Sequence, residues 1–166
     1  MKSIETARLL IREMNSDDAA FILQLLNEES FLAGIGDKGV KTLENALDYI
    51  QSNGVDLYEQ GGMGMRLVEL IDAGAPVGVC GLLKRDFLEW PDVGFAISEP
   101  YQGKGFAAEA AKAMVAQGLD ELGYKHICGI TSDTNLASQR LLEKLGLSLE
   151  RMVRMSEESD EIRLYS

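Results

Sequence analysis

The stretch that decides the fold runs from Asp92 to Ala111 and reads Asp-Val-Gly-Phe-Ala-Ile-Ser-Glu-Pro-Tyr-Gln-Gly-Lys-Gly-Phe-Ala-Ala-Glu-Ala-Ala. It predicts a strand, a loop that contains a proline, and a helix that opens after Gly103 and Gly105. Glycine has no Cβ, so this loop can turn sharply and direct successive N–H groups at one point. The helix start adds unpaired N–H groups and the positive end of its dipole. We therefore expect a pyrophosphate site, with Lys104 as the cation inside the loop.

Two other interpretations of these glycines compete with that one. The first is a plain turn that only joins strand to helix. The second is a dinucleotide fold, because Gly103–Ala108 fits G-x-G-x-x-A. Its context argues against this fold, which needs a tight turn, whereas Ser98–Gln102 separates the strand from the first glycine. A phosphate-transferring P-loop is excluded, since the sequence contains no G-x-x-x-x-G-K-[ST] string.

The rest of the chain extends the pattern in both directions. Hydrophobic periodicity predicts further strands at Thr6–Met14, Met65–Ile71, Val77–Lys84, His126–Ser132, Ser148–Met155 and Glu161–Tyr165. It predicts helices from Phe21 to Leu26, after a cap at Thr42, at Ala107–Leu122 and at Asn135–Leu145. Phe31–Lys41 contains three glycines and is predicted to be a loop. No repeat or linker interrupts the chain, so we expect one α/β domain over residues 1–166. Its central sheet is mixed and mostly antiparallel, with helices on both faces and a right-handed parallel crossover from Asp92 to Ser132.

Composition excludes several classes of partner. The chain has 166 residues, with 16 Lys and Arg against 27 Asp and Glu, which gives a net charge of −11. Nucleic acids and anionic membrane surfaces both require a basic face, so neither is expected as a partner. The longest apolar runs, such as Val77–Leu83, are too short to span a bilayer. The N-terminus has no apolar signal core, so we expect a cytoplasmic protein. Cys80 and Cys128 lie in apolar segments and are interpreted as small buried hydrophobic residues, with no metal site.

Two motifs on this order of elements resemble the GNAT superfamily of acyl-CoA-dependent N-acetyltransferases. The family signature Q/R-x-x-G-x-G/A reads Gln102-Gly-Lys-Gly-Phe-Ala107. The second signature is an Asn that precedes a helix with a glycine near its end, here Asn135-Leu-Ala-Ser-Gln-Arg-Leu-Leu-Glu-Lys-Leu-Gly-Leu147. The start, Thr6-Ala-Arg-Leu-Leu-Ile-Arg12, and Ser138 resemble the ribosomal-protein N-terminal acetyltransferases, the RimJ/RimL-like subgroup. The resemblance covers nearly the whole chain.

The resemblance implies acetyl-CoA as cosubstrate, placed between two parallel strands that splay apart. Backbone groups of Phe95, Ala96 and Ile97 would pair with the pantetheine arm, and an N–H near Ile97 would polarise the thioester carbonyl. Asn135 would contact the pantetheine arm or the acetyl end, against the alternative of a plain helix N-cap, and it can fill both roles. The implied pyrophosphate loop and its flanks comprise Gln102, Gly103, Lys104, Gly105, Phe106, Ala107 and Ala108.

The implied reaction is direct attack of a neutral amine on the thioester. We nominate Asp92 as a base that acts through water, against the alternative of a solvated carboxylate at a strand start. Ser138 is nominated to hydrogen-bond the sulfur, against the alternative of local helix capping. Many relatives carry a Tyr proton donor seven residues after the Asn, where this chain has Leu142. A thiol with a pKa near 8.5 can leave without that donor.

These expectations define an N-acetyltransferase that acts on a primary amine, either a protein N-terminal α-amine or a small molecule. The chain is expected to be a monomer or a homodimer. The missing tyrosine keeps a second hypothesis open, a catalytically degenerate module that binds acyl-CoA without turnover. A dinucleotide oxidoreductase is the third hypothesis, and it predicts that NAD(H) binds in preference to CoA.

Overall fold

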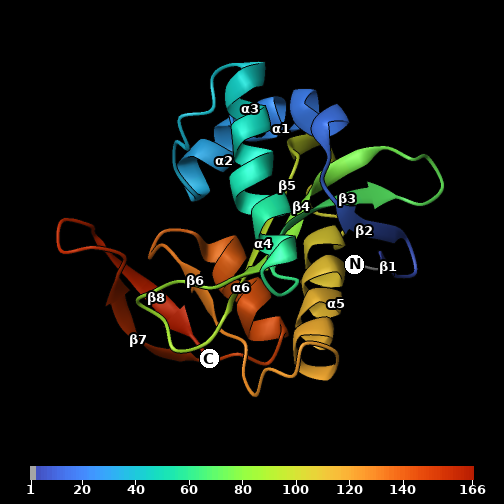
Figure 1. Cartoon of the computed structure of the whole chain (residues 1–166). Coiled ribbons are helices and arrows are strands. Elements are labelled where there is room, and N and C mark those ends of the chain that lie inside the picture. Colours follow the sequence, from blue (N-terminus) through green and yellow to red (C-terminus); the bar gives the residue numbers. More distant parts are fainter. Residues whose placement is uncertain (1–2) are drawn as a thin grey trace.

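Two antiparallel sheets form the centre of the molecule, which the computed structural model describes over residues 3–166 (Figure 1). The larger sheet has five strands in the order β1-β2-β3-β4-β5. Its strands are β1 (Ile4–Glu5), β2 (Leu9–Glu13), β3 (Gly64–Leu70), β4 (Pro76–Leu83) and β5 (Asp92–Ile97). Each pairs antiparallel with its neighbour, and β3 and β4 form the predicted hairpin.

The smaller sheet has three strands in the order β6-β8-β7 and is also antiparallel. Its strands are β6 (Gly129–Thr131), β7 (Leu149–Arg154) and β8 (Glu161–Tyr165). In Figure 1, β7 and β8 lie to the side of the larger sheet, at the red end of the colour scale. The chain therefore begins in one sheet and ends in the other.

Helices cover both faces of the larger sheet. The main ones are α1 (Ala19–Leu25), α2 (Glu29–Gly34), α3 (Leu43–Ile50), α4 (Asp56–Glu59), α5 (Phe106–Asp120) and α6 (Leu136–Lys144). A π-helical turn, η2 (Gln51–Val55), joins α3 to α4, and short 3₁₀ turns form η1 (Ser16–Asp18) and η3 (Glu99–Tyr101). In Figure 1, α1 and α3 lie together at one end of the molecule, away from α5 and α6.

The alternation of side chains along the strands divides the core into two layers. Val68 packs in a cluster with Met114 of α5, whereas its neighbour Leu67 packs in a second cluster with Ile22 of α1 and Ala46 of α3. Successive residues of a strand point to opposite faces, so one strand supplies both layers. Each face is completed by apolar side chains of helices.

Side-chain caps set the starts of two predicted helices. Thr42 Oγ1 accepts a hydrogen bond from Asn45 N at 3.1 Å at the start of α3. Asn135 Oδ1 accepts one from Ser138 N at 3.1 Å at the start of α6. Each cap satisfies an N–H group that has no partner within its helix. Both cap positions agree with the sequence interpretation.

The α/β class, the mostly antiparallel strands and the helices on both faces are confirmed. The predicted loop at Phe31–Lys41 is wrong in its first part, because α2 extends to Gly34. Glycine lowers helix propensity, but here it ends the helix instead of preventing it. The strand predicted at His126–Ser132 is shorter, since only Gly129–Thr131 is regular. Within the described residues, no helix is long and apolar enough to cross a bilayer.

The two sheets meet at one isolated parallel bridge between Asp92 and Cys128. Val93 N donates to Cys128 O at 2.8 Å, and Cys128 N donates to Pro91 O at 2.9 Å. The sequence predicts a parallel strand pair between residues 92–98 and 126–132. Between these segments the structure contains only this bridge. The larger part of β5 therefore lies at the edge of its sheet.

An ion pair with a buried carboxylate lies at this junction. Asp92 is 1% exposed, and its Oδ1 accepts a hydrogen bond from Arg85 Nε at 2.7 Å. Burial raises the pKa of Asp92, and the charge and hydrogen bond of Arg85 oppose that shift. Arg85 belongs to the segment between β4 and β5, so the pair ties this segment to the start of β5.

Replacing Arg85 by Gln is expected to lower the free energy of unfolding by about 2 kcal/mol at neutral pH. The substitution leaves the Asp92 carboxylate buried without its partner charge, and Arg85 is itself partly exposed, which moderates the loss. Urea unfolding measures the change. The loss should shrink in acid, because protonated Asp92 needs no partner charge.

The matched control is Arg85→Gln combined with Asp92→Asn, which removes both charges. We expect the double variant to be more stable than Arg85→Gln alone at neutral pH. Equal stability of the two variants would show that the ion pair is not what the single substitution disrupts.

Candidate active site

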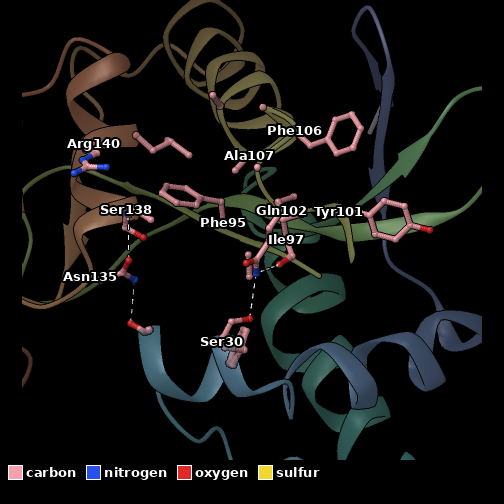
Figure 2. Close-up of a pocket in the computed structure, with 18 of the residues that line it drawn as sticks. Ser30, Phe95, Ile97, Tyr101, Gln102, Phe106, Ala107, Asn135, Ser138 and Arg140 are labelled. Atoms are coloured by element: carbon pink, nitrogen blue, oxygen red, sulfur yellow. Dashed lines mark hydrogen bonds between the residues drawn. The ribbon is translucent and has the colours of Figure 1, made fainter. Parts of the chain in front are cut away.

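A cavity of about 580 Å³ opens where α2, β5, α5 and α6 converge (Figure 2). Every residue predicted to bind the cofactor lines it, with the exception of Lys104. These lining residues are Phe95, Ala96, Ile97, Gln102, Gly103, Gly105, Phe106, Ala107, Ala108, Asn135 and Ser138. The fold therefore brings together segments that are far apart in the sequence.

The glycine loop forms one end of the cavity. Gly103 has φ +74° and Gly105 has φ +83°, a left-handed backbone conformation that other residues rarely adopt. Gly105 is also the N-cap of α5, so the loop leads directly into the first turn of a helix of 15 residues. The N–H groups of the first turn, which have no partner within the helix, and the helix dipole favour an anion at this end of the cavity. A Cβ at Gly103 would meet no atom within 4 Å, which leaves the approach to the loop open.

The edge of β5 forms a second wall. Alternate residues of a strand direct their N–H and C=O groups to opposite sides. Val93 N points across to Cys128, the residue before β6. Ser98 N points to β4, where it donates to Val77 O at 2.8 Å. By the same alternation, the backbone of Phe95 and Ile97 faces away from β4. An extended ligand can therefore pair with this edge as an additional strand would.

Helix α2 forms a third wall and contacts both neighbouring segments. The Gln102 side chain donates to Ser30 Oγ at 3.1 Å and to Ile97 O at 2.8 Å, as Figure 2 shows. At the other end of α2, Asn135 Nδ2 donates to Gly34 O at 3.3 Å. A Cβ at Gly34 would lie 3.0 Å from Asn135 Nδ2, so glycine permits this close approach. The Gln102 and Asn135 amides thus hold α2 against β5 and α6.

Cations line the cavity at positions that the sequence interpretation missed. Arg140 and Lys144 lie on α6, one helical turn apart, and both line the cavity. Lys104 does not line it, and its Nζ lies 5.6 Å from the centre of the Tyr101 ring. Both cations fall within the predicted helix Asn135–Leu145, but helical spacing alone does not show that they face a cavity.

The two nominated catalytic residues are placed differently. Ser138 lines the cavity and lies beside Asn135 in Figure 2. Asp92 does not line it, and its carboxylate is bound to Arg85 in the protein interior. The base role of Asp92 stays a prediction that this geometry does not support. Leu142 is 1% exposed and packs on Gly129, where a Cβ would lie 2.3 Å from Leu142 Cδ2.

The two cysteines lie in the protein interior. Cys80 and Cys128 are free and buried, as predicted. Burial raises the pKa of each thiol to about 12, with Asp92 adding to the effect at Cys128. Among residues 3–166, no group of three or more His, Cys, Asp or Glu side chains is placed to hold a metal ion.

Comparison with curated proteins finds similar chains of comparable length. The chain is 28% identical over 147 residues to the uncharacterized N-acetyltransferase YnaD of Bacillus subtilis, with 89% of this chain and 83% of that protein covered. It is 26% identical over 153 residues to the uncharacterized N-acetyltransferase YoaA of the same organism, with 91% and 85% covered.

Solved structures share the fold. The acetyltransferase of Agrobacterium tumefaciens superposes with a TM-score of 0.84 at 21% identity, over 100% of this chain and 95% of that one. RimL, a ribosomal L7/L12 α-N-protein acetyltransferase solved in complex with coenzyme A, gives a TM-score of 0.84 at 16% identity, over 99% and 96%.

The chain also matches a protein family over most of its length. Residues 8–148 match the family described as the acetyltransferase (GNAT) domain, a range that includes β2 to α6 and every lining segment of the cavity. The chain therefore belongs to the GNAT acetyltransferase family.

Proposed function

We propose that this chain is one N-acetyltransferase domain that transfers acetyl from acetyl-CoA to a primary amine. The observation that carries the proposal is the cavity, which joins a glycine loop at the start of α5 to the outward-facing edge of β5. A pyrophosphate requires convergent N–H groups, and a pantetheine arm requires an extended edge to pair with. The glycine loop and the edge of β5 border the same cavity, and Arg140 and Lys144 add positive charge to its wall.

The residues present fit the cosubstrate. Gly103, Gly105 and the first turn of α5 would hold the pyrophosphate, and the backbone of Phe95 and Ile97 would hold the pantetheine arm. Acetyl-CoA supplies an acetyl group activated as a thioester. The amine nitrogen attacks the carbonyl carbon, the bond from carbon to sulfur breaks, and the amine proton passes to water while the thiolate leaves. The N–H of Ile97 is proposed to stabilise the charge on the carbonyl oxygen.

The lining of the cavity favours an α-amine as acceptor. Among the described residues that line it, none is Asp, Glu or His. An α-amino group has a pKa near 7.7–8.0, so about a tenth of it is neutral at pH 7, whereas a lysine with a pKa near 10.4 is almost wholly charged. An amine that is already partly neutral at this pH depends least on a protein base to remove its proton. The α-amine of a protein, as in the RimL relative, is therefore the first choice, and a small amine is the second.

The buried Leu142 supports a second candidate, a module that binds acyl-CoA without turnover. Its side chain fills space against Gly129 and cannot donate a proton. Such a module would retain the glycine loop and the edge of β5. Binding and turnover must therefore be measured separately.

Turnover is tested by mixing the protein, acetyl-CoA and peptides with free or blocked N-termini, and by following release of free thiol. We expect thiol release with the free α-amine and little with a peptide whose lysine is the only amine. Raising the pH toward the lysine pKa should narrow the difference in thiol release between the two peptides, because more of the lysine amine is then neutral. Binding of CoA without thiol release from any amine would favour the binding module.

Replacing Gly105 by Val is expected to weaken CoA binding about tenfold, because a β-branched residue is strained at φ +83° and its side chain crowds the loop. Calorimetric titration with CoA gives the dissociation constant. The control is Gly74→Val in the turn from β3 to β4, where φ is +60° and no atom lies within 4 Å of the new Cβ. Equal CoA affinity in both variants would contradict the proposed phosphate site.

Replacing Ser138 by Ala is expected to lower kcat about fivefold while KM for acetyl-CoA changes less than about twofold, if its hydroxyl stabilises the departing sulfur. Steady-state kinetics at saturating amine gives both constants. Ser132→Ala is the control, since Ser132 does not line the cavity. An unchanged kcat in Ser138→Ala would remove this hydroxyl from the reaction.

A further inference from the structure

The N-terminal motif Thr6-Ala-Arg-Leu contacts the glycine loop, although nearly 100 residues separate the two in sequence. Glu109, in the first turn of α5, joins them. Its Oε1 accepts hydrogen bonds from Thr6 Oγ1 at 2.6 Å and from Arg8 N at 2.9 Å. Its Oε2 accepts from Arg8 Nε at 2.8 Å and lies 2.7 Å from Arg8 Nη2. One carboxylate therefore receives both the hydroxyl of Thr6 and the guanidinium of Arg8.

Arg8 also contacts the glycine loop directly. Its Nη1 donates to Lys104 O at 3.0 Å, and its guanidinium lies 4.5 Å from the centre of the Phe106 ring. A Cβ at Gly105 would lie 3.4 Å from Arg8 Nη2, so the guanidinium packs directly against the left-handed glycine. Arg8 thus contacts Lys104, Gly105 and Phe106, the segment where the loop becomes α5.

These contacts differ from an ordinary surface ion pair. Isolated exposed pairs contribute little to stability, because two flexible side chains must be fixed for one contact. Here the Glu109 side chain is 19% exposed and binds a backbone N–H as well as two side chains. The planar guanidinium binds a carboxylate, a carbonyl and an aromatic face at once, which a lysine cannot do. Partial burial raises the pKa of Glu109, but the hydrogen bonds from Thr6 and Arg8 together with the charge of Arg8 outweigh it, so the pKa is lowered overall.

We infer that Thr6, Arg8 and Glu109 form a clamp that fixes the glycine loop in the conformation that binds the cofactor pyrophosphate. The inference rests on the proposed function, since it assumes that CoA binds in this cavity. The three are positioning residues, because Arg8 acts on the loop from its outer side through the carbonyl of Lys104. A preorganised loop binds its ligand more tightly, since less ordering is left to occur on binding. The N-terminal motif therefore tunes affinity for the phosphate part of the cofactor.

The decisive variant is Glu109→Gln, which keeps the shape of the side chain and removes its charge. If Glu109 acted only through its charge, removing a negative charge near a polyanion would strengthen CoA binding. The clamp predicts the opposite sign, a dissociation constant for CoA that rises about 3- to 10-fold. Pantetheine, which lacks the pyrophosphate and the nucleotide, should bind with unchanged affinity. Arg8→Lys should act in the same direction as Glu109→Gln.

Glu69→Gln is the matched control. Glu69 of β3 pairs with Arg12 of β2 at 2.6 Å, and its side chain is 16% exposed. Its hydrogen bonds go to Arg12 and not to the glycine loop. Its substitution should leave CoA affinity unchanged. Amide hydrogen exchange without ligand gives a second readout, and we expect faster exchange in residues 103–109 of Glu109→Gln than in the wild type.

The outcomes separate the two proposals. No CoA binding by the wild type would overturn the proposed function and, with it, the role of the clamp. Wild-type binding with unchanged or tighter CoA affinity in Glu109→Gln would overturn the clamp alone. A parallel loss of pantetheine affinity would also overturn it, because the defect would then extend beyond the phosphate loop. Weaker CoA binding with unchanged pantetheine binding supports it.

Discussion

The single parallel step between Asp92 and Cys128 is the constraint on which the rest of the structure depends. Before it, an ion pair between Arg85 and the buried Asp92 ties the segment between β4 and β5 to the strand. After it, β5 and β6 pair with different strands, β4 and β8. The backbone of β5 that faces away from β4 therefore lies toward the cavity, and α5 and α6 approach it from the ends of these two strands. A longer ladder between β5 and β6 would occupy the backbone groups that the proposed ligand needs.

The distribution of charge in the chain is uneven in a way that suits this arrangement. The net charge is −11, yet the charged side chains in the wall of the cavity are the cations Arg140 and Lys144. Arg8 adds a third cation behind the glycine loop, with its charge balanced by Glu109. An acidic protein can bind a polyanion under these conditions, because local N–H groups and nearby cations determine the potential at the site. The total charge is therefore a poor guide to the cosubstrate.

Much of this arrangement could be predicted from the sequence, since local patterns encode it. Caps at Thr42 and Asn135, the hairpin of β3 and β4, and the glycines before α5 all appear as short signals. The errors have a common physical origin, which is tertiary contact. Helix α2 is short and ends at a glycine, and its hydrogen bonds to Gln102 and Asn135 cannot be read from neighbouring residues. Asp92 looked like a solvent-accessible base because its partner Arg85 comes from a segment without a regular pattern. Lys104 was predicted to bind the cofactor but does not line the cavity, whereas Arg140 and Lys144 line it and were not predicted. The reason is the same, since spacing alone does not say which side chain turns toward a cavity.

The two buried cysteines have a practical consequence for measuring the thiol product. A thiol reacts with disulfides and alkylating reagents in its ionised form, and protonation and burial both suppress that reaction. Cys80 is 0% exposed, Cys128 is 3% exposed, and the pKa of each lies near 12. In the native protein both side chains should therefore be inert toward aromatic disulfide reagents at neutral pH. Free coenzyme A can then be titrated directly in the presence of the folded enzyme, and a slow colour increase without substrate would report transient opening of the core.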